Sequence, residues 1–277
     1  PTTHPIVADI PDLEAAKLNF DGITYAKGAS VLKQLVGFVG EEAFFRGAQR
    51  YFAAHAYGNT TLEDLLVALE EASGRDLRSW STAWLETTGL PTLTVERGPL
   101  AVVQDVARPH AVRVGLWDDE AGRLVARGDV AVDLFSERTL VDAPVLPDTA
   151  LVIANVDDRS YAKVRLDDRS LAAVTAGLSS MPDAVARGVV WAALWNAVRD
   201  GELAASVYLA IAADHAPRES HPALLSDVLA HAAFAIRHYV SDVERASAAW
   251  LEGAWRAMAA ADAGSDAQLI WARAVGV

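Results

Sequence analysis

Hydrophobic positions in residues 11–89 recur every three or four residues, which predicts a run of helices. Four are expected, over residues 24–39, 41–55, 62–72 and 77–88. The apolar side of the first consists of Leu32, Leu35, Val36 and Val39, and that of the second of Phe44, Phe45, Ala48, Tyr51 and Phe52. We expect these two sides to face the core of a helical region.

Polar residues and glycines mark the ends of these helices. Asp21 can accept hydrogen bonds from the free amides of the first turn that follows it. Thr60 and Glu63 have the spacing of a capping box at the start of the third helix. Gly40 is expected to end the first helix in a left-handed conformation, and Pro91 follows the fourth.

From Pro91 onward the period changes to that of short strands. Seven Val- and Leu-rich segments are expected as strands, over residues 92–96, 100–105, 110–117, 123–133, 138–141, 150–154 and 161–166. Turn signals such as Gly98-Pro99, Arg108-Pro109 and the stretch from Pro144 to Asp148 separate them. Short strands at this spacing predict a small antiparallel β-sandwich.

Residues 168–277 return to the helical period. Breaks are expected near Pro182, Asp200-Gly201, Pro217, Pro222, Ser241 and Gly264. Helices joined by short loops predict stacked helical hairpins. The chain is therefore expected to be a multidomain α+β protein, with domains over residues 1–90, 91–167 and 168–277.

Charge and composition narrow the classes of partner. The 277 residues carry 37 Asp and Glu against 24 Lys and Arg, for a formal net charge of −13. This balance argues against nucleic acid and anionic membranes as main partners, because both are polyanions. The chain has no cysteine, which excludes thiolate zinc sites and a cysteine nucleophile. No apolar run is long enough to predict a transmembrane helix.

The common catalytic motifs do not occur in the sequence. No two histidines are four apart, so the helical zinc-binding pair is missing. His231 and His238 could share a helix face, but we interpret them as surface or packing residues. Asn155 opens a segment like a calcium loop, yet Arg159 follows where an acceptor is needed, so we expect a turn. Composition and spacing alone therefore assign no reaction.

One segment adds a specific resemblance. The run NFDGITYAKGA over residues 19–29 resembles the tyrosine segment of the zinc aminopeptidases of the aminopeptidase N family, where Tyr-x-Lys-Gly-Ala opens a helix. The flanking runs THPI, GEEAF, NTTLEDL and WLETTGLP, which begin at residues 3, 40, 59 and 84, resemble the family in the same order. Asn155 and the run YAKVRL over residues 161–166 resemble its last strands.

The resemblance implies a fold and a mechanism. It implies the helical half of a thermolysin-like catalytic domain over residues 1–90, then the β-sandwich, then the start of an armadillo- or HEAT-like helical domain. In the family, one zinc ion held by two His and one Glu activates a water that attacks the N-terminal peptide bond. A tyrosine hydroxyl stabilises the resulting oxyanion, and Tyr25 corresponds to that residue. We interpret Lys27 and Gly28 as structural, Lys27 in a local ion pair and Gly28 in close helix packing.

Other parts of the family's active site have no counterpart in this chain. The zinc ligands, the general base and the glutamate that binds the substrate amine precede the tyrosine segment in the family, and none is found here. We therefore interpret the chain as a C-terminal piece of a zinc aminopeptidase, which supplies Tyr25 as the catalytic residue and no metal ligand.

Several expectations follow from this interpretation. The substrates of the full-length enzyme are expected to be peptides with a free N-terminus, the location cytoplasmic, and the source bacterial, because the composition is rich in Ala and Arg. By itself the piece is expected to be inactive, to bind no zinc, and to self-associate through a face near Phe20, Ile23 and Tyr25.

Two alternatives stay open. A non-catalytic interaction scaffold derived from the family would have the same domains without the metal half. A His-Glu-x-x-His helix encoded before Pro1 would decide for the enzyme. An epoxide-hydrolysing relative shares the tyrosine segment but lacks a sandwich, so the strands expected over residues 92–166 argue against it.

Overall fold

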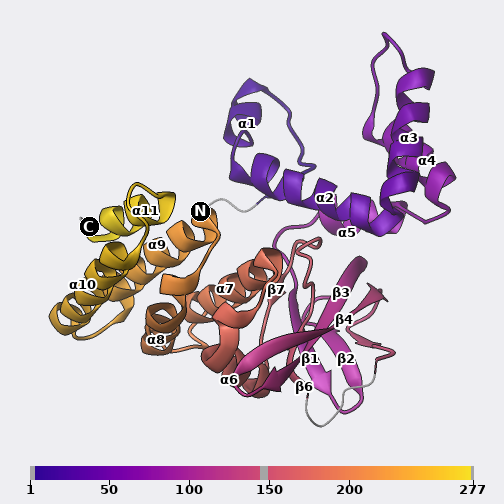
Figure 1. Cartoon of the computed structure of the whole chain (residues 1–277). Coiled ribbons are helices and arrows are strands. Elements are labelled where there is room, and N and C mark those ends of the chain that lie inside the picture. The colour runs from indigo at the N-terminus through magenta and orange to yellow at the C-terminus, as the bar shows by residue number, and fades with distance from the viewer. Residues whose placement is uncertain (1–3, 144–148, 276–277) are drawn as a thin grey trace. The chain divides into compact units, whose positions relative to one another are not determined.

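The structure, a computed structural model, describes residues 4–143 and 149–275 (Figure 1). It contains two compact units. The first consists of the described residues within Pro1–Gly115, Asp129–Val145 and Ala154–Lys163, and the second of those within Leu116–Gly128, Leu146–Ile153 and Val164–Val277. The unit boundaries pass within strands β3 (His110–Glu120) and β4 (Arg123–Leu134). The domain limits expected after residues 90 and 167 stay a prediction.

Helices fill the first part of the chain. They are α1 (Leu13–Leu18), η1 (Ile23–Lys27), α2 (Gly28–Val39), α3 (Glu41–Ala54), α4 (Leu62–Ser73) and α5 (Arg78–Leu85). The four helices expected between residues 24 and 88 are thus present. The first of them differs in one respect, because it begins with η1, a single π-helical turn, and becomes α-helical only at Gly28.

The helix ends agree with the sequence only in part. Gly40 ends α2 with the expected positive φ of 86°, but its ψ of 136° lies outside the left-handed helical region that the sequence predicts. The capping box of α4 is formed by Thr61 and Asp64, whose amide nitrogens each contact the other's side-chain oxygen at 2.7 and 3.4 Å. The expected pair, Thr60 and Glu63, is therefore wrong by one residue. Both pairs have the same spacing, but α4 starts at Leu62, so only Thr61 occupies the N-cap.

The core of the helical part lies between α2, α4 and α5. Its buried residues are Val31, Leu35, Phe38, Val39, Leu66, Leu69, Leu77, Trp80 and Trp84. The expected apolar side of α2 is half correct, since Leu35 and Val39 are buried but Leu32 is exposed. Phe38, which the sequence pattern does not place on the buried side, is buried as well. Its ring stacks on that of Trp80, with centroids 6.3 Å apart.

Helix α3 is fully buried only at small residues, and of its expected apolar stripe Phe44 packs, half-buried, against the helical core. Phe45 and Phe52 of the expected stripe are exposed, whereas Ala43 and Gly47 are buried. A Cβ atom at Gly47 would lie 2.8 Å from Leu69 Cδ2 and 2.9 Å from the main-chain oxygen of Ala68. The backbones of α3 and α4 therefore approach too closely for any larger residue, and this approach decides which face of α3 is buried.

We expect Gly47→Ala to destabilise the protein by about 1–3 kcal/mol, because the added methyl meets a main-chain atom that cannot rotate away. Gly28→Ala is the matched control. It is also helical, has no atom within 4 Å of an added Cβ, and should be neutral or stabilising by up to about 1 kcal/mol. Thermal unfolding midpoints of the two variants test this, and equal midpoints would contradict the close approach at Gly47.

The seven expected strands are all present. They are β1 (Thr92–Arg97), β2 (Leu100–Gln104), β3, β4, β5 (Arg138–Leu140), β6 (Thr149–Ile153) and β7 (Lys163–Val164). They form a four-stranded sheet of order β5-β2-β1-β7 and a three-stranded sheet of order β4-β3-β6. Strand β2 is antiparallel to both of its neighbours, with Leu100 opposite Arg97 and Ala101 opposite Leu140. The turn expected over residues 144–148 lies outside the described residues.

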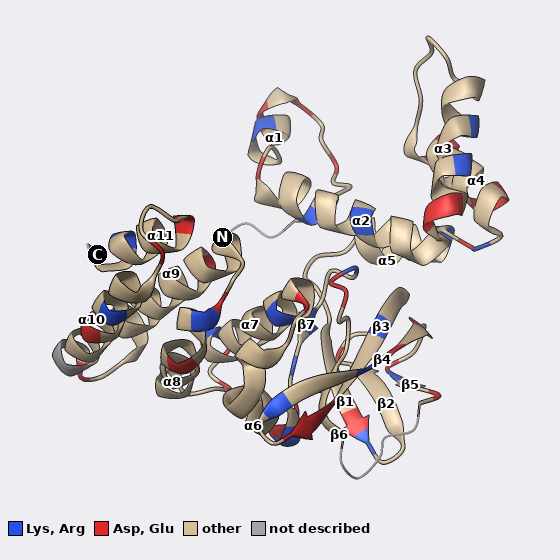
Figure 2. Cartoon of the chain, in the orientation of Figure 1, with Lys and Arg blue, Asp and Glu red and all other residues tan. Residues whose placement is uncertain are grey.

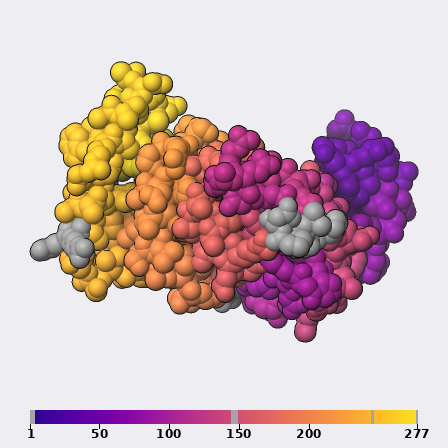
Figure 3. All heavy atoms as spheres, turned by 60° about the horizontal axis from the view of Figure 1, so that its bottom comes forward, coloured from indigo at the N-terminus to yellow at the C-terminus, as the bar shows by residue number. Residues whose placement is uncertain are grey.

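The residues that follow the last strand, coloured salmon to yellow in Figure 3, are mainly helical. The helices are α6 (Asp168–Gly177), η2 (Leu178–Ser180), α7 (Ala184–Arg199), α8 (Ala205–His215), η3 (Ala216–Arg218), α9 (Pro222–Tyr239), α10 (Val243–Ala260) and α11 (Asp266–Val275). Each expected break coincides with the start of an α-helix or the space between two. Within the described residues, no helix has the length and apolar character needed to cross a bilayer.

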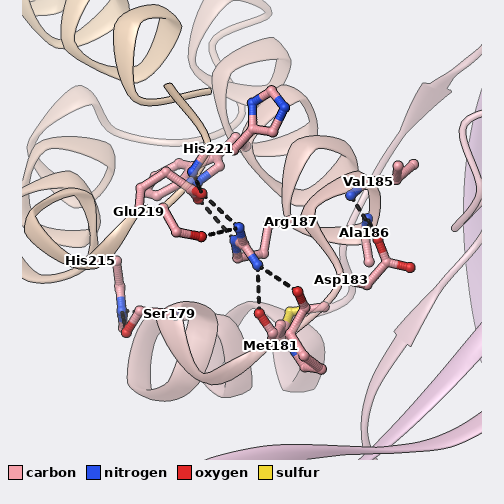
Figure 4. A network of polar contacts seen from close by, with 12 residues as sticks. Ser179, Met181, Asp183, Val185, Ala186, Arg187, His215, Glu219 and His221 are labelled. Atoms are coloured by element: carbon pink, nitrogen blue, oxygen red, sulfur yellow. Dashed lines mark hydrogen bonds and ion pairs between the residues drawn. The ribbon is translucent and has the colours of Figure 1, made fainter. Parts of the chain in front are cut away.

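A buried ion pair joins α7 to the segment before α9 (Figure 4). The Arg187 guanidinium donates to both carboxylate oxygens of Glu219, with N–O distances of 2.9 and 2.7 Å. It also donates to the carbonyls of Met181 and Pro182 at 2.7 and 3.1 Å, while the amide of His221 donates to Glu219 at 2.9 Å. Both side chains are almost fully buried, so this pair fixes one arrangement of the connecting segments.

Charged residues are spread over helices and strands in Figure 2. Several exposed arginines have an acidic partner, as in the pairs Arg46–Glu42, Arg78–Glu63 and Arg138–Glu96. Much of the positive charge is thus neutralised locally, which leaves the surplus of acidic residues to set the sign of the surface.

Candidate functional site

Tyr25 lies in the middle of the π-helical turn η1. The amide of Gly28 donates to the carbonyl of Ile23, five residues earlier, which is the hydrogen bond of a π-helix. Sequence patterns predict an α-helix here. The structure has a wider π-helical turn instead, which a hydrophobic period of 3.6 residues cannot reveal. Such turns occur frequently at functional sites, so the position of Tyr25 within one makes it a candidate.

The side chain of Tyr25 is accessible from solvent. It is 57% exposed, and its ring contacts that of Phe20 edge to face with centroids 5.0 Å apart. Phe20 is itself 74% exposed, whereas Ile23 is half-buried. Within the part of the chain that the structure describes, no hydrogen bond occupies the Tyr25 hydroxyl. The phenol is therefore free to donate to a group that approaches from outside this chain.

Asp21 caps the turn as the sequence predicts. Its Oδ1 accepts hydrogen bonds from the amides of Ile23 and Thr24 at 2.8 and 3.2 Å. Burial works to raise the pKa of the Asp21 carboxyl, but these hydrogen bonds and one from His4 outweigh it and hold the pKa below its ordinary value. Asp21 is thus an anion at the start of the helix that carries Tyr25.

Lys27 is buried behind the turn, with 5% of its surface exposed. Its Nζ donates to the main-chain oxygen of Thr87 at 2.8 Å, just beyond the end of α5. The expected ion pair of Lys27 is therefore wrong, because the described partner is a carbonyl. Arg108 donates to the neighbouring carbonyls of Thr88 and Gly89. Burial, and to a smaller extent the charge of Arg108, lower the pKa of Lys27.

Gly28 does not have the packing role that its place in the motif suggests. No atom outside its own helix lies within 4 Å of the position of an added Cβ, and its φ is −57°. The expectation of close helix packing at Gly28 is therefore wrong, and a side chain would fit there. The structure gives no other reason for a glycine at this position.

The histidines do not form a metal centre. His231 stacks on Trp195 with centroids 4.4 Å apart, and His238 contacts Phe234 at 4.3 Å, so their expected packing roles are confirmed. Over residues 4–143 and 149–275, no three His, Asp or Glu side chains lie close enough together to hold a metal ion. The described residues therefore do not fit the zinc ion that the resemblance implies.

A buried polar network that the sequence patterns miss connects α2 to the start of β3 and to the segment between β6 and β7. Gln34 Oε1 accepts from the Ser160 hydroxyl at 3.0 Å and from the Tyr161 amide at 2.8 Å. Because the Ser160 proton points to Gln34, its oxygen accepts from His110 Nδ1–H. Burial, together with the charge of Arg108, lowers the pKa of His110 to about 3, so its ring is neutral.

The Ser160–His110 contact is consequently not a nucleophile and its base. A base would have to accept the serine proton, and here the ring donates instead. Asn155 completes the network, since its amide group exchanges two hydrogen bonds with the main chain of Ser160 at 2.8 and 2.9 Å. Asn155 has a φ of 56°, in agreement with the expected turn. This network is structural, which leaves Tyr25 as the candidate catalytic group.

Two family descriptions match the chain. Residues 1–84 match the Peptidase family M1 domain, and residues 151–276 match the ERAP1-like C-terminal domain. The first match contains Tyr25 and its surroundings, and the second contains the helices from α6 to α11.

Curated relatives agree with these descriptions. Aminopeptidase N of Streptomyces lividans is 45% identical over an alignment of 298 positions, which covers 99% of this chain and 35% of that protein. Tricorn protease-interacting factor F2 of Thermoplasma volcanium is 40% identical over 95 residues, which cover 34% of this chain and 12% of that protein. Aminopeptidase 2, mitochondrial, of Saccharomyces cerevisiae is 41% identical over 96 residues, which cover 34% of this chain and 10% of that protein.

The chain thus corresponds to about a third of the length of the Streptomyces relative. The identity extends over nearly all of this chain, through the helices, the strands and the final helices alike. The family resemblance of the tyrosine segment is therefore confirmed by matches on both sides of it. The chain belongs to the aminopeptidase N family of M1 peptidases.

Proposed function

We propose that this chain is part of a zinc metalloaminopeptidase that removes the N-terminal residue from peptides. The observation that carries the proposal is the 45% identity with an aminopeptidase N over 99% of the chain. The zinc ligands would be supplied from outside this chain, and its own catalytic contribution is the hydroxyl of Tyr25. The bacterial source and the cytoplasmic location expected from the sequence belong to the same proposal.

In this proposal the Tyr25 hydroxyl donates a hydrogen bond to the oxyanion that forms when the substrate carbonyl is attacked. Three features support the role. The side chain is exposed, no described residue occupies its hydroxyl, and it lies near the amino end of a helix, where the local dipole favours negative charge. A donor that is already in place stabilises the developing charge without a reorganisation cost.

The domain arrangement is part of the proposal as well. Residues 1–90 would be the helical half of a thermolysin-like catalytic domain, residues 91–167 a β-sandwich, and residues 168–277 a helical-hairpin region of armadillo or HEAT type. The order of helices, strands and helices supports this arrangement. On its own, the chain would self-associate through the exposed face around Phe20 and Tyr25.

The proposal is tested with the full-length protein and a panel of aminoacyl-4-nitroanilides. We expect release of nitroaniline that zinc chelation abolishes and zinc restores. N-acetylation of the same substrates should lower kcat/KM by at least about 10²-fold, because a site built to bind an ammonium group rejects an analogue without one. A folded full-length protein that hydrolyses no member of the panel would instead be the non-catalytic scaffold.

A further inference from the structure

Asp21 accepts three hydrogen bonds at the start of the turn that carries Tyr25, two of them with its side chain. Its carboxylate Oδ1 accepts from the amides of Ile23 and Thr24, and its main-chain oxygen accepts from the amide of Tyr25 at 3.1 Å. These three amides are the free donors at the start of the helix. The place where the turn begins, and hence the direction of the Tyr25 side chain, therefore depends on Asp21.

His4 holds the other oxygen of that carboxylate. Its Nε2 lies 3.2 Å from Asp21 Oδ2, and its Nδ1 lies 2.7 Å from the carbonyl oxygen of Pro5. A carbonyl and a carboxylate can only accept hydrogen bonds, so both ring nitrogens must carry a proton for both bonds to form. The geometry thus requires an imidazolium, opposite in charge to Asp21.

The surroundings of His4 agree with this charge. The hydrogen bond to the Pro5 carbonyl and that to Asp21 raise the pKa of His4, against partial burial. The charged groups that act on it are Asp21 and, in the opposite sense, Lys27. The side chain of His4 is only 16% exposed and that of Asp21 34% exposed, so solvent screens the pair less than it would a surface ion pair.

The segment that contains His4 is anchored to the end of α5. The amide of Val7 donates to the carbonyl of Leu85 at 2.8 Å, and Ile6 packs against the helical core. On the other side of Tyr25, Lys27 contacts Thr87, two residues beyond Leu85. Polar contacts therefore hold both ends of the turn near the end of α5. The start is held through Asp21, His4 and the segment that Val7 anchors to Leu85, and the end is held through Lys27 and Thr87.

We propose that His4, as an imidazolium, is a positioning residue for Tyr25, which it fixes through Asp21 in the orientation that oxyanion stabilisation requires. The inference rests on the proposed function. His4 itself touches no reacting atom. Its loss would let the start of the turn move, and a displacement of about 1 Å in a catalytic group can cost about 10²-fold in rate.

The test uses the full-length enzyme and a double-mutant cycle between His4→Ala and Tyr25→Phe. His4→Ala should lower kcat by about 10- to 10²-fold with KM changed less than about twofold. In the Tyr25→Phe background the same substitution should change kcat less than about twofold, because there is no hydroxyl left to position. His55→Ala is the matched control, since His55 faces Asp64 at 4.0 Å in the same unit and should leave kcat unchanged.

The outcomes separate this inference from the proposed function. If Tyr25→Phe leaves kcat unchanged, the role of Tyr25 fails and the inference fails with it. If Tyr25→Phe lowers kcat but His4→Ala does not, only the positioning role of His4 is wrong. An equal loss from His4→Ala in both backgrounds would also overturn it, because the effect would then not pass through Tyr25.

A second measurement reads the protonation of His4 directly in the wild-type enzyme. In full-length enzyme with ¹⁵N-labelled histidine, both ring nitrogens of His4 should have the chemical shifts of protonated nitrogens at neutral pH. His4→Gln serves to assign the signal, because it removes the ring and keeps one donor for Asp21. A neutral His4 ring at neutral pH would contradict the proposal.

Discussion

Replacement of Tyr25 by phenylalanine should lower kcat of the full-length enzyme by about 10²–10³-fold and leave KM nearly unchanged. The substitution removes one oxygen from an exposed ring whose hydroxyl has no hydrogen bond within the described residues, so the fold loses nothing with it. The contact with Phe20 is made by the ring and is kept. The loss would therefore report only the interaction with the developing oxyanion, which is absent in the bound substrate.

Steady-state kinetics with an aminoacyl-4-nitroanilide measure this effect. Tyr57→Phe is the control, because Tyr57 is fully exposed at the turn between α3 and α4 and loses the same atom. Its kcat should equal that of the wild type. A Tyr25→Phe variant with more than about half of the wild-type kcat would mean that another group donates to the oxyanion, and that Tyr25 has a different role.

Glu219→Gln should destabilise the second unit by about 3–5 kcal/mol, because it leaves the buried Arg187 guanidinium without a counter-charge. Arg187→Met should cost a similar amount, since it leaves the carboxylate buried and removes the donor to the Met181 and Pro182 carbonyls. The double variant should cost less than the sum of the two, because each single change already breaks the pair. Denaturant unfolding of the three variants measures these differences.

The stabilisation that the Arg187–Glu219 pair provides depends on pH. Burial works to raise the pKa of the Glu219 carboxyl, but the hydrogen bonds from Arg187 and His221 outweigh it and hold the pKa below the ordinary 4.5. The stabilisation is therefore complete at neutral pH and is lost only as the pH falls through the lowered value.

Arg256→Gln is the control for this series. Arg256 pairs with Glu252 one turn away on the surface of α10, and its loss should change the free energy of unfolding by less than about 0.5 kcal/mol. If Glu219→Gln shifted the unfolding midpoint no more than Arg256→Gln does, the buried pair would contribute nothing beyond an ordinary surface contact.

The sequence predicts those elements of the fold whose ends are set by nearby residues such as glycine and proline. The strands on either side of Gly98-Pro99 and the helix starts near Pro182 and Pro222 lie where glycine and proline predict them. The capping box and the buried face of α3 were not predictable in this way. Thr60 and Thr61 offer the same spacing, and the burial of Gly47 depends on how closely α4 approaches, which is a tertiary property.

In the candidate site, too, features set by local sequence are predictable and features set by tertiary contacts are not. A run of residues that resembles a family identifies Tyr25, and capping chemistry identifies Asp21. The partner of Lys27 is a carbonyl sixty residues away, and His4 and Asp21 are separated by seventeen residues, so no local pattern reveals either contact. The His110 network likewise joins residues from three distant segments. The sequence therefore identifies Tyr25 and Asp21, whereas the residues that hold them in place can be recognised only in the folded chain.

The π-helical turn at Tyr25 makes the site depend on the number of residues as well as on their identity. A π-turn contains about one residue more than an α-turn, and each residue of a helix corresponds to a rotation of about 100°. Ala26 is exposed, so a substitution there would leave the turn intact. A deletion of Ala26 would instead convert the turn to an α-turn and rotate Tyr25 away from its present direction. At position 26 the length of the segment therefore matters more to the direction of Tyr25 than the identity of the residue does.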